Sequence, residues 1–158
     1  WKLTLRSDLM EIVDDPRNLA ILRKIVPIIG SQEMFDAVYR NVDLSARTIR
    51  KIQINLLQRG DFVGRHIDTD SNPQWMMACV LMLSKQYEGG EYILVHPDDG
   101  SERRFAPQYG SLFISRTDVN HWVSPVTDGV RKTLVYFIGT DLMPNVNGPN
   151  LIEPGKYG

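Results

Sequence analysis

The sequence lacks a second cysteine, so no disulfide can form within the chain. The single thiol, Cys79, lies in the apolar run 75–83, and we expect it to be a small buried core residue rather than a reactive group. A chain without disulfides is typical of a reducing compartment. We therefore expect a cytoplasmic protein.

The sequence also has almost no net charge and no long hydrophobic run. Lys and Arg total 18 against 19 for Asp and Glu, which gives a formal charge of −1, and no basic block could neutralise a run of phosphates. Nucleic acid is therefore not an expected partner. The apolar stretches are shorter than the roughly 18 residues that span a bilayer, and no signal-like segment begins the chain, so we expect no membrane association.

What is present has the size of one ordinary domain. We expect the 158 residues to form a single domain with a helical N-terminal support at about 7–45, a β core at about 49–140 and an irregular tail at 141–158. The tail is rich in proline and glycine and has few apolar residues. The chain begins with Trp1 rather than methionine, which suggests a trimmed or excised domain.

Capping and proline signals predict the helices of the N-terminal support. Ser7 or Asp8 can cap a first helical segment, and Pro16 suits the first position of a helix. An apolar stripe at helical spacing then continues to Pro27, where we expect the helix to end. Ser31 is a candidate start of a further helix. We expect these helices to pack against a sheet.

From Ile49 onward the hydrophobic period changes to two, which is typical of β-strands. In the first run Ile52, Ile54 and Leu56 alternate with polar residues, as in a strand with one buried face. Turn clusters rich in Gly, Pro and Asp separate the later runs. About eight short strands at this spacing favour a mainly β jelly-roll barrel with N-terminal helices, an α+β fold. The later strands are expected at 63–68, 75–83, 91–95, 103–105, 111–115, 121–123 and 131–139.

Three residues in these strands could bind a metal ion. His66 and Asp68 are two residues apart and would share one face of a strand, although such a pair alone is more often a surface coincidence. His121 would add a third ligand from another strand and complete two histidines and one carboxylate, the pattern of non-haem Fe(II) oxygenases. The remaining coordination positions could accept a keto acid and dioxygen. The same residues can hold catalytic zinc with a water, and this alternative stays open.

Arg131 favours the iron alternative. It begins the last apolar strand, where a period of two places Arg131, Thr133, Val135 and Phe137 on one face. A buried guanidinium needs an anion, and a carboxylate suits its two parallel N–H groups. Thr133 can add a hydroxyl beside it. We therefore expect both residues to bind an organic acid co-substrate.

The run from Ile52 to Gly139 resembles the Fe(II)- and 2-oxoglutarate-dependent dioxygenases, in particular the prolyl-4-hydroxylase-like branch. The resemblance implies a double-stranded β-helix of the jelly-roll or cupin kind, with Fe(II) on His66, Asp68 and His121 and 2-oxoglutarate on Arg131. It also implies O2 consumption, succinate and CO2 as co-products, and ascorbate as an added reductant. The matching motifs are His66-x-Asp68, Tyr87-Glu-Gly-Gly-Glu91, Gly110-Ser-Leu-Phe-Ile114, His121-Trp-Val-Ser-Pro125 and Gly129-Val-Arg131.

The sequence departs from the prolyl-hydroxylase pattern where hydroxyl donors are common. Leu56 and Leu57 stand where one tyrosine is usual, and Met82 stands in place of another. Thr133 and a further donor that the sequence does not identify would have to replace them. Residues close in sequence to the ligands are candidates for substrate contact, namely Trp75, Arg116 and Trp122.

The expected reaction is hydroxylation of an unactivated C–H bond in a peptidyl residue such as proline, in a free amino acid or in a related small molecule. Two alternatives stay open. One is a cupin-type hydrolase or isomerase with zinc or manganese on the same ligands, and the other is a non-catalytic module that senses 2-oxoglutarate. The sequence identifies neither the substrate nor the oligomeric state.

Overall fold

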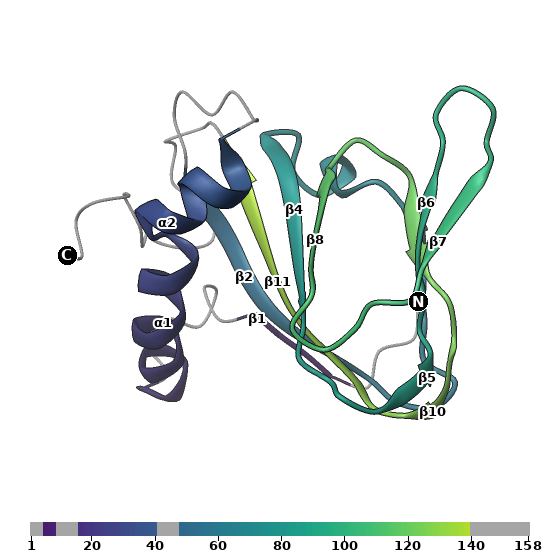
Figure 1. Ribbon diagram of the computed structural model, residues 1–158, viewed down its shortest axis with the longest axis horizontal. Helices are drawn as coiled ribbons and strands as arrows, with labels where there is room; N and C mark the ends of the chain where they lie inside the picture. The colour runs from purple at the N-terminus through teal and green to yellow at the C-terminus, as the bar shows by residue number, and fades with distance from the viewer. Residues whose placement is uncertain (1–4, 9–15, 41–47, 140–158) are drawn as a thin grey trace.

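The computed structural model describes residues 5–8, 16–40 and 48–139, which form two facing β-sheets and a helical layer (Figure 1). The N-terminal part contains β1 (Leu5–Asp8), α1 (Pro16–Ile29), α2 (Gln32–Met34) and the π-helical turn η1 (Phe35–Tyr39). The remaining elements are β2 (Thr48–Leu57), β3 (Val63–His66), the 3-10 turn η2 (Asp68–Asp70), β4 (Trp75–Met82), β5 (Tyr87–Gly89), β6 (Tyr92–Val95), β7 (Glu102–Phe105), β8 (Leu112–Arg116), β9 (His121–Val123), β10 (Val126–Gly129) and β11 (Arg131–Gly139).

The larger sheet has five strands in the order β1-β2-β11-β4-β8, and the smaller sheet has four in the order β3-β9-β6-β7. All their pairings are antiparallel. In Figure 1 the two sheets form opposite walls that converge near the short pair β10-β5, while α1 and α2 cover the outer face of the larger sheet. The predicted jelly-roll fold, a double-stranded β-helix buttressed by helices, is confirmed.

The helices differ from the sequence prediction in two places. Helix α1 begins at Pro16 as predicted but continues past Pro27 to Ile29. Pro27 lacks a backbone N–H, but the helical bonding continues beyond it, because the N–H of Gly30 still bonds the Val26 carbonyl at 2.9 Å. Ser31 caps α2 as predicted, since its hydroxyl accepts from the N–H of Met34. None of the helices in the described part of the chain has the length and apolar character needed to cross a membrane.

Most strand predictions were accurate, and those that failed concern residues that we expected to form a helix cap or turns. The bounds of β9 and β11 are those expected. In contrast, β1 includes Ser7 and Asp8, which we expected to begin a helical portion, and β5 and β10 lie where we expected turns. Gly89 and Gly129 have φ values of 69° and 72°, so this pair combines turn-like residues with strand pairing.

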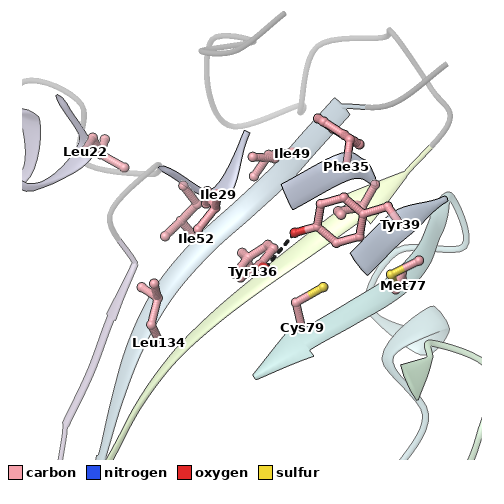
Figure 2. Packing of buried hydrophobic residues seen from close by; sticks show 11 residues of the cluster. Leu22, Ile29, Phe35, Tyr39, Ile49, Ile52, Met77, Cys79, Leu134 and Tyr136 are labelled. Atoms are coloured by element: carbon pink, nitrogen blue, oxygen red, sulfur yellow. Dashed lines mark hydrogen bonds between the residues drawn. The ribbon is translucent and has the colours of Figure 1, made fainter. Parts of the chain in front are cut away.

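Strands β2, β4 and β11 are buried on both faces. Their outer face packs on the helices, and Figure 2 shows this layer with Tyr39, Cys79 and Tyr136 at its centre. The hydroxyls of Tyr39 and Tyr136 are 2.7 Å apart, and burial raises the pKa of the Cys79 thiol to about 12. Cys79 is therefore a protonated core residue, as expected.

The inner face of the larger sheet looks toward the smaller sheet, and two β-bulges determine which side chains reach it. Residue 76 is the extra residue where β4 pairs with the end of β11, and residue 50 has this role in β2. Because a bulge reverses the alternation of side chains, Met77 packs on the helices whereas Trp75 packs on the inner cluster.

We predict that Tyr39→Phe lowers the free energy of unfolding by about 1–3 kcal/mol, because it leaves the buried Tyr136 hydroxyl without this partner. The double variant Tyr39→Phe/Tyr136→Phe should lose less than the sum of the single variants, since neither hydroxyl is then stranded. Urea denaturation measures both, and Tyr109→Phe at an exposed position is the control. Strict additivity of the two changes would contradict the prediction.

Candidate metal centre

The three predicted metal ligands come together between the two sheets. His66 at the end of β3 is directly opposite His121 at the start of β9, and the centroids of their rings are 4.2 Å apart. Asp68 follows in η2, where its backbone N–H bonds the Thr117 carbonyl at 2.8 Å. One ligand atom from each of the three residues lies within 4.8 Å of the others.

The sequence argument for Asp68 was wrong in one detail. We expected His66 and Asp68 to share the face of one strand, but β3 ends at His66 and Asp68 begins a 3-10 turn. The 3-10 turn, rather than the alternation of a strand, places the Asp68 carboxylate between the two imidazole rings. Asp68 Oδ1 is 3.4 Å from His66 Nε2, and Asp68 Oδ2 is 3.6 Å from His121 Nε2.

The backbone fixes the protonation pattern of both imidazole rings. Nδ1 of His66 lies 2.8 Å from the Gly64 carbonyl oxygen, and Nδ1 of His121 lies 2.9 Å from that of Val119. A carbonyl oxygen only accepts hydrogen bonds, so each Nδ1 must carry the hydrogen. In the neutral ring the lone pair on Nε2 then faces Asp68, which is the orientation that metal-binding histidines adopt.

This arrangement requires a cation. Burial lowers the pKa of His121, although the nearby Asp68 carboxylate opposes the shift, so the ring is neutral near pH 7. Asp68 is 7 % exposed, and its Oδ2 has no hydrogen-bond partner among the described residues. Lone pairs of two imidazoles and a buried carboxylate therefore converge on one point, and a divalent metal ion fits that donor set.

Arg131 lies in the same pocket and is 2 % exposed. Its Nε donates to the Gly90 carbonyl at 3.0 Å, and no carboxylate of the described residues forms an ion pair with it. Burial lowers the pKa of Arg131, and the hydroxyls of Tyr87 and Tyr92 oppose this shift. A guanidinium buried in this way is suited to binding an anionic ligand.

Tyr92 is a pocket residue that the sequence did not identify. It lies on β6, is 4 % exposed, and its ring centroid is 5.3 Å from that of His121. Its hydroxyl lies 3.1 Å from Ser115 Oγ on β8, and both Asp68 and Arg131 influence its pKa, which burial raises. The only sequence signal for it was its place in the strand expected at 91–95, where a period of two puts Tyr92 and Leu94 on one face. Tyr92 therefore adds a hydroxyl to the pocket from β6, whereas Leu57 and Met82, at the positions where tyrosines are usual, have none.

The pocket has a volume of about 110 Å³. His66, His121 and Tyr92 come from the smaller sheet, whereas Arg131 and Thr133 come from the larger one. Thr133 is fully buried, and its hydroxyl has no hydrogen-bond partner among the described residues. The other lining residues are Lys51, Gln53, Asn55, Val63, Asp68, Ser71, Trp75, Ala78, Val80, Val123, Val135 and Phe137.

Of the three residues suggested for substrate contact, only Trp75 lines this pocket. Trp122 alternates with the inward His121, and its Nε1 donates to the exposed Glu102 at 3.1 Å beneath Arg104. Arg116 is exposed and forms a bidentate pair with Asp118. Trp122 and Arg116 are therefore not among the described residues that line the metal pocket.

Comparison with known proteins agrees with this geometry. The family model of the 2OG-Fe(II) oxygenase superfamily matches residues 52–139, which is more than half of the chain and contains His66, Asp68, His121, Tyr92, Arg131 and Thr133. A comparison with curated protein sequences gives no match.

Solved structures share the fold. A 2OG-Fe(II) oxygenase family oxidoreductase from Burkholderia pseudomallei is 27% identical, with a TM-score of 0.76, and the match covers 92% of this chain and 70% of that one. A prolyl-4-hydroxylase from Pseudomonas putida is 22% identical, with a TM-score of 0.53 and coverages of 79% and 64%. The viral collagen prolyl hydroxylase of Paramecium Bursaria Chlorella virus-1 is 16% identical, with a TM-score of 0.61 and coverages of 88% and 80%.

We predict that Asp68→Asn lowers the affinity for Mn(II) or Zn(II) more than the roughly 10- to 100-fold that losing an outer partner of a ligand costs, because it removes the carboxylate charge from the donor set. Isothermal titration calorimetry measures the affinity. Asp118→Asn, an exposed change away from the donor set, should bind metal like the parent protein. Equal affinity in Asp68→Asn would exclude the carboxylate as a ligand.

Proposed function

Because this chain belongs to the 2OG-Fe(II) oxygenase superfamily, we propose that it is an Fe(II)- and 2-oxoglutarate-dependent dioxygenase that hydroxylates an unactivated C–H bond. The observation that carries the proposal is the donor set of His66, Asp68 and His121, with both Nε2 lone pairs directed at a buried carboxylate. The substrate would be a peptidyl residue of the prolyl type, a free amino acid or a related small molecule. The fold shared with prolyl hydroxylases supports this range.

The metal ligands would hold Fe(II) on one side and leave the side toward Arg131 accessible. When bound, Fe(II) would supply the chemistry by which O2 oxidises both molecules: one oxygen atom enters succinate as 2-oxoglutarate loses CO2, and the other is inserted into the C–H bond of the substrate. His66, Asp68 and His121 need only keep their geometry, and their backbone contacts do this.

Arg131 would bind the distal carboxylate of 2-oxoglutarate. Its Nε is bonded to the Gly90 carbonyl, and the Tyr87 hydroxyl also contacts the guanidinium, so the group is held in place to bind an anion. Gly90 has φ 61°, and a Cβ there would lie 2.7 Å from Cδ of Arg131, so the close approach requires glycine. Thr133 lies two residues along the same face, and its unpartnered hydroxyl would contact the same ligand.

Tyr92 would provide the further hydroxyl that the sequence did not identify. It lies between the metal centre and Arg131, and Ser115 Oγ can donate to the Tyr92 oxygen, which leaves the phenolic hydrogen for the co-substrate. The Leu57 and Met82 side chains, which are fully buried beside Arg131 and Thr133, would then make the neighbouring wall apolar. The co-substrate would therefore receive its polar contacts from both sheets.

We predict succinate formation from 2-oxoglutarate with Fe(II), O2 and ascorbate, and its loss in His66→Ala and His121→Ala because each removes a metal ligand. Mass spectrometry of succinate measures the reaction. Succinate formation that survives either substitution would exclude the triad.

Retention of metal with no binding or conversion of 2-oxoglutarate, and no response to N-oxalylglycine, would favour a cupin-type hydrolase or isomerase. Tight 2-oxoglutarate binding without any turnover would favour a sensing module.

Arg131→Lys should raise the KM for 2-oxoglutarate by roughly ten- to hundredfold, because a hydrogen bond to a charged group contributes about 1.5–3 kcal/mol and lysine cannot reproduce the guanidinium fork. Steady-state succinate formation gives the KM. Lys132→Met, at the exposed neighbouring position, is the matched control. An unchanged KM in Arg131→Lys would remove Arg131 from the co-substrate site.

Tyr92→Phe should raise the same KM by roughly two- to tenfold, the effect of one neutral hydrogen bond, and should leave metal affinity unchanged. Titration of the Zn(II)-loaded protein with 2-oxoglutarate gives a second measure that does not depend on turnover. An equal KM for Tyr92→Phe and the parent protein would contradict the assignment.

A further inference from the structure

Two buried side chains of the metal pocket have polar atoms that the proposed function does not use. Among the described residues, the buried side-chain polar atoms without a hydrogen-bond partner are Gln53 Oε1, Asp68 Oδ2, Trp75 Nε1 and Thr133 Oγ1. All four residues line the metal pocket. The proposed metal ion and 2-oxoglutarate account for Asp68 and Thr133. One acceptor, on Gln53, and one donor, on Trp75, are left, and folded proteins rarely leave such atoms unpaired.

The side chain of Gln53 is oriented by its neighbour on β2. Its amide nitrogen donates to Asn55 Oδ1 at 3.3 Å, so its oxygen is the atom without a partner. Gln53 is 8 % exposed, lines the pocket and pairs with Val135 of β11. A side-chain amide held in this way offers a ligand one neutral acceptor.

Trp75 offers the complementary group. Its indole stacks on Phe137 of β11, with ring centroids 4.0 Å apart and planes at 17°, so the N–H, which lies in the plane of the indole, points past the Phe137 ring. The Trp75 carbonyl accepts from the Thr117 hydroxyl, and the Thr117 carbonyl accepts from the N–H of Asp68. Trp75 is therefore connected to the metal-binding turn and offers a ligand one neutral donor.

The two groups come from opposite sides of one apolar ridge. Val135 and Phe137 form this ridge on the inner face of β11, and both line the pocket. Gln53 lies on β2 and Trp75 on β4, the two strands that flank β11. Because neighbouring strands are about 4.8 Å apart, a ligand that bonds both groups lies across the ridge. Such a ligand needs an acceptor on one side, a donor on the other and an apolar part between them.

The neutrality of both groups favours a neutral ligand at these two positions. Removing a carboxylate or an ammonium group from water costs more than one hydrogen bond from a neutral partner contributes, whereas an amide carbonyl or N–H is matched by one such bond. A residue within a peptide has the required pattern. A carbonyl precedes it, an amide N–H follows it, and its side chain lies between them.

We propose that Gln53 and Trp75 are specificity-determining residues that bind the amide groups on the two sides of the residue to be hydroxylated. The carbonyl that precedes this residue accepts from Trp75 Nε1, and the N–H that follows it donates to Gln53 Oε1. The substrate class is a residue blocked as an amide at both ends, rather than a free amino acid. A ligand that leaves either buried group unpaired is rejected. This inference rests on the proposed function, because it places the substrate beside the loaded metal centre.

Binding can be measured without turnover on the Zn(II)- and 2-oxoglutarate-loaded protein by isothermal titration calorimetry. The probes are a panel of N-acetyl amino acid N-methylamides, their N,N-dimethylamides, which keep both carbonyls but lack the N–H that follows the residue, and the free amino acids. The best N-methylamide should bind at least roughly tenfold more tightly than its dimethylamide, the effect of one buried hydrogen bond. The free amino acid should bind more weakly than the N-methylamide by at least the same factor.

Gln53→Met should remove the difference between the N-methylamide and the dimethylamide, because the acceptor for the N–H is then absent. A penalty caused only by the size of the added methyl group would persist in this variant. Gln58→Met, at an exposed position directly after β2, is the matched control and should retain the difference. A difference that persists in Gln53→Met, or no difference in the parent protein, would exclude Gln53 from substrate recognition.

The indole N–H of Trp75 reports its own contact in NMR spectra of the loaded protein labelled with ¹⁵N-tryptophan. The chain has three tryptophans, and Trp75→Phe identifies the Trp75 signal. The best N-methylamide should shift this signal, whereas the Trp122 signal should not move because its N–H is bonded to Glu102. Trp75→Phe should raise the Kd of this probe by roughly tenfold or more, and Trp122→Phe should not change it. A Trp75 signal that stays in place at saturation would exclude the indole as a donor.

Failure of this inference differs from failure of the proposed function. Free amino acids that bind as tightly as the blocked ones, or a panel in which no probe binds, would overturn the inference if the protein binds 2-oxoglutarate and forms succinate without a second substrate. Protein that binds metal but neither binds nor converts 2-oxoglutarate would instead refute the proposed function, and this inference with it.

Discussion

The structure of the site depends on one electrostatic constraint, the convergence of two imidazole lone pairs on the buried carboxylate of Asp68. Without a cation these groups repel one another and bury an uncompensated charge. The chain nevertheless fixes all three, through the β3–β9 register and three backbone hydrogen bonds. The stability of the β-helix thus holds a geometry that is unfavourable until metal binds.

The larger sheet supports this centre by using its two faces differently. Its outer face packs on α1, α2 and η1 through apolar side chains and the Tyr39–Tyr136 hydrogen bond (Figure 2). Its inner face carries three of the four buried side-chain polar atoms that lack a hydrogen-bond partner among the described residues, those of Gln53, Trp75 and Thr133. Packing free energy from the outer layer can therefore offset the cost of the polar inner layer.

The sequence predicted the elements whose signals are local. Periodicity located β9 and β11 and placed Arg131 and Thr133 on one face, and the family pattern identified His66, Asp68 and His121. Three features depended on long-range packing and were not predictable in this way. The polar side of β2 faces a pocket because a second sheet covers it. Tyr92 approaches His121 only through the pairing of β6 with β9, and Trp75 turns inward only because of a bulge.

The different roles of the two faces of β2 also restrict how the gene can change over evolutionary time. Substitution at an inward position of β2 alters one pocket side chain and leaves the opposite face intact. Insertion or deletion of one residue within the strand would exchange its two faces, placing Ile52 in the pocket and Gln53 against the helices. Relatives that diverge in substrate should therefore differ here by residue identity, while the length of the strand is retained.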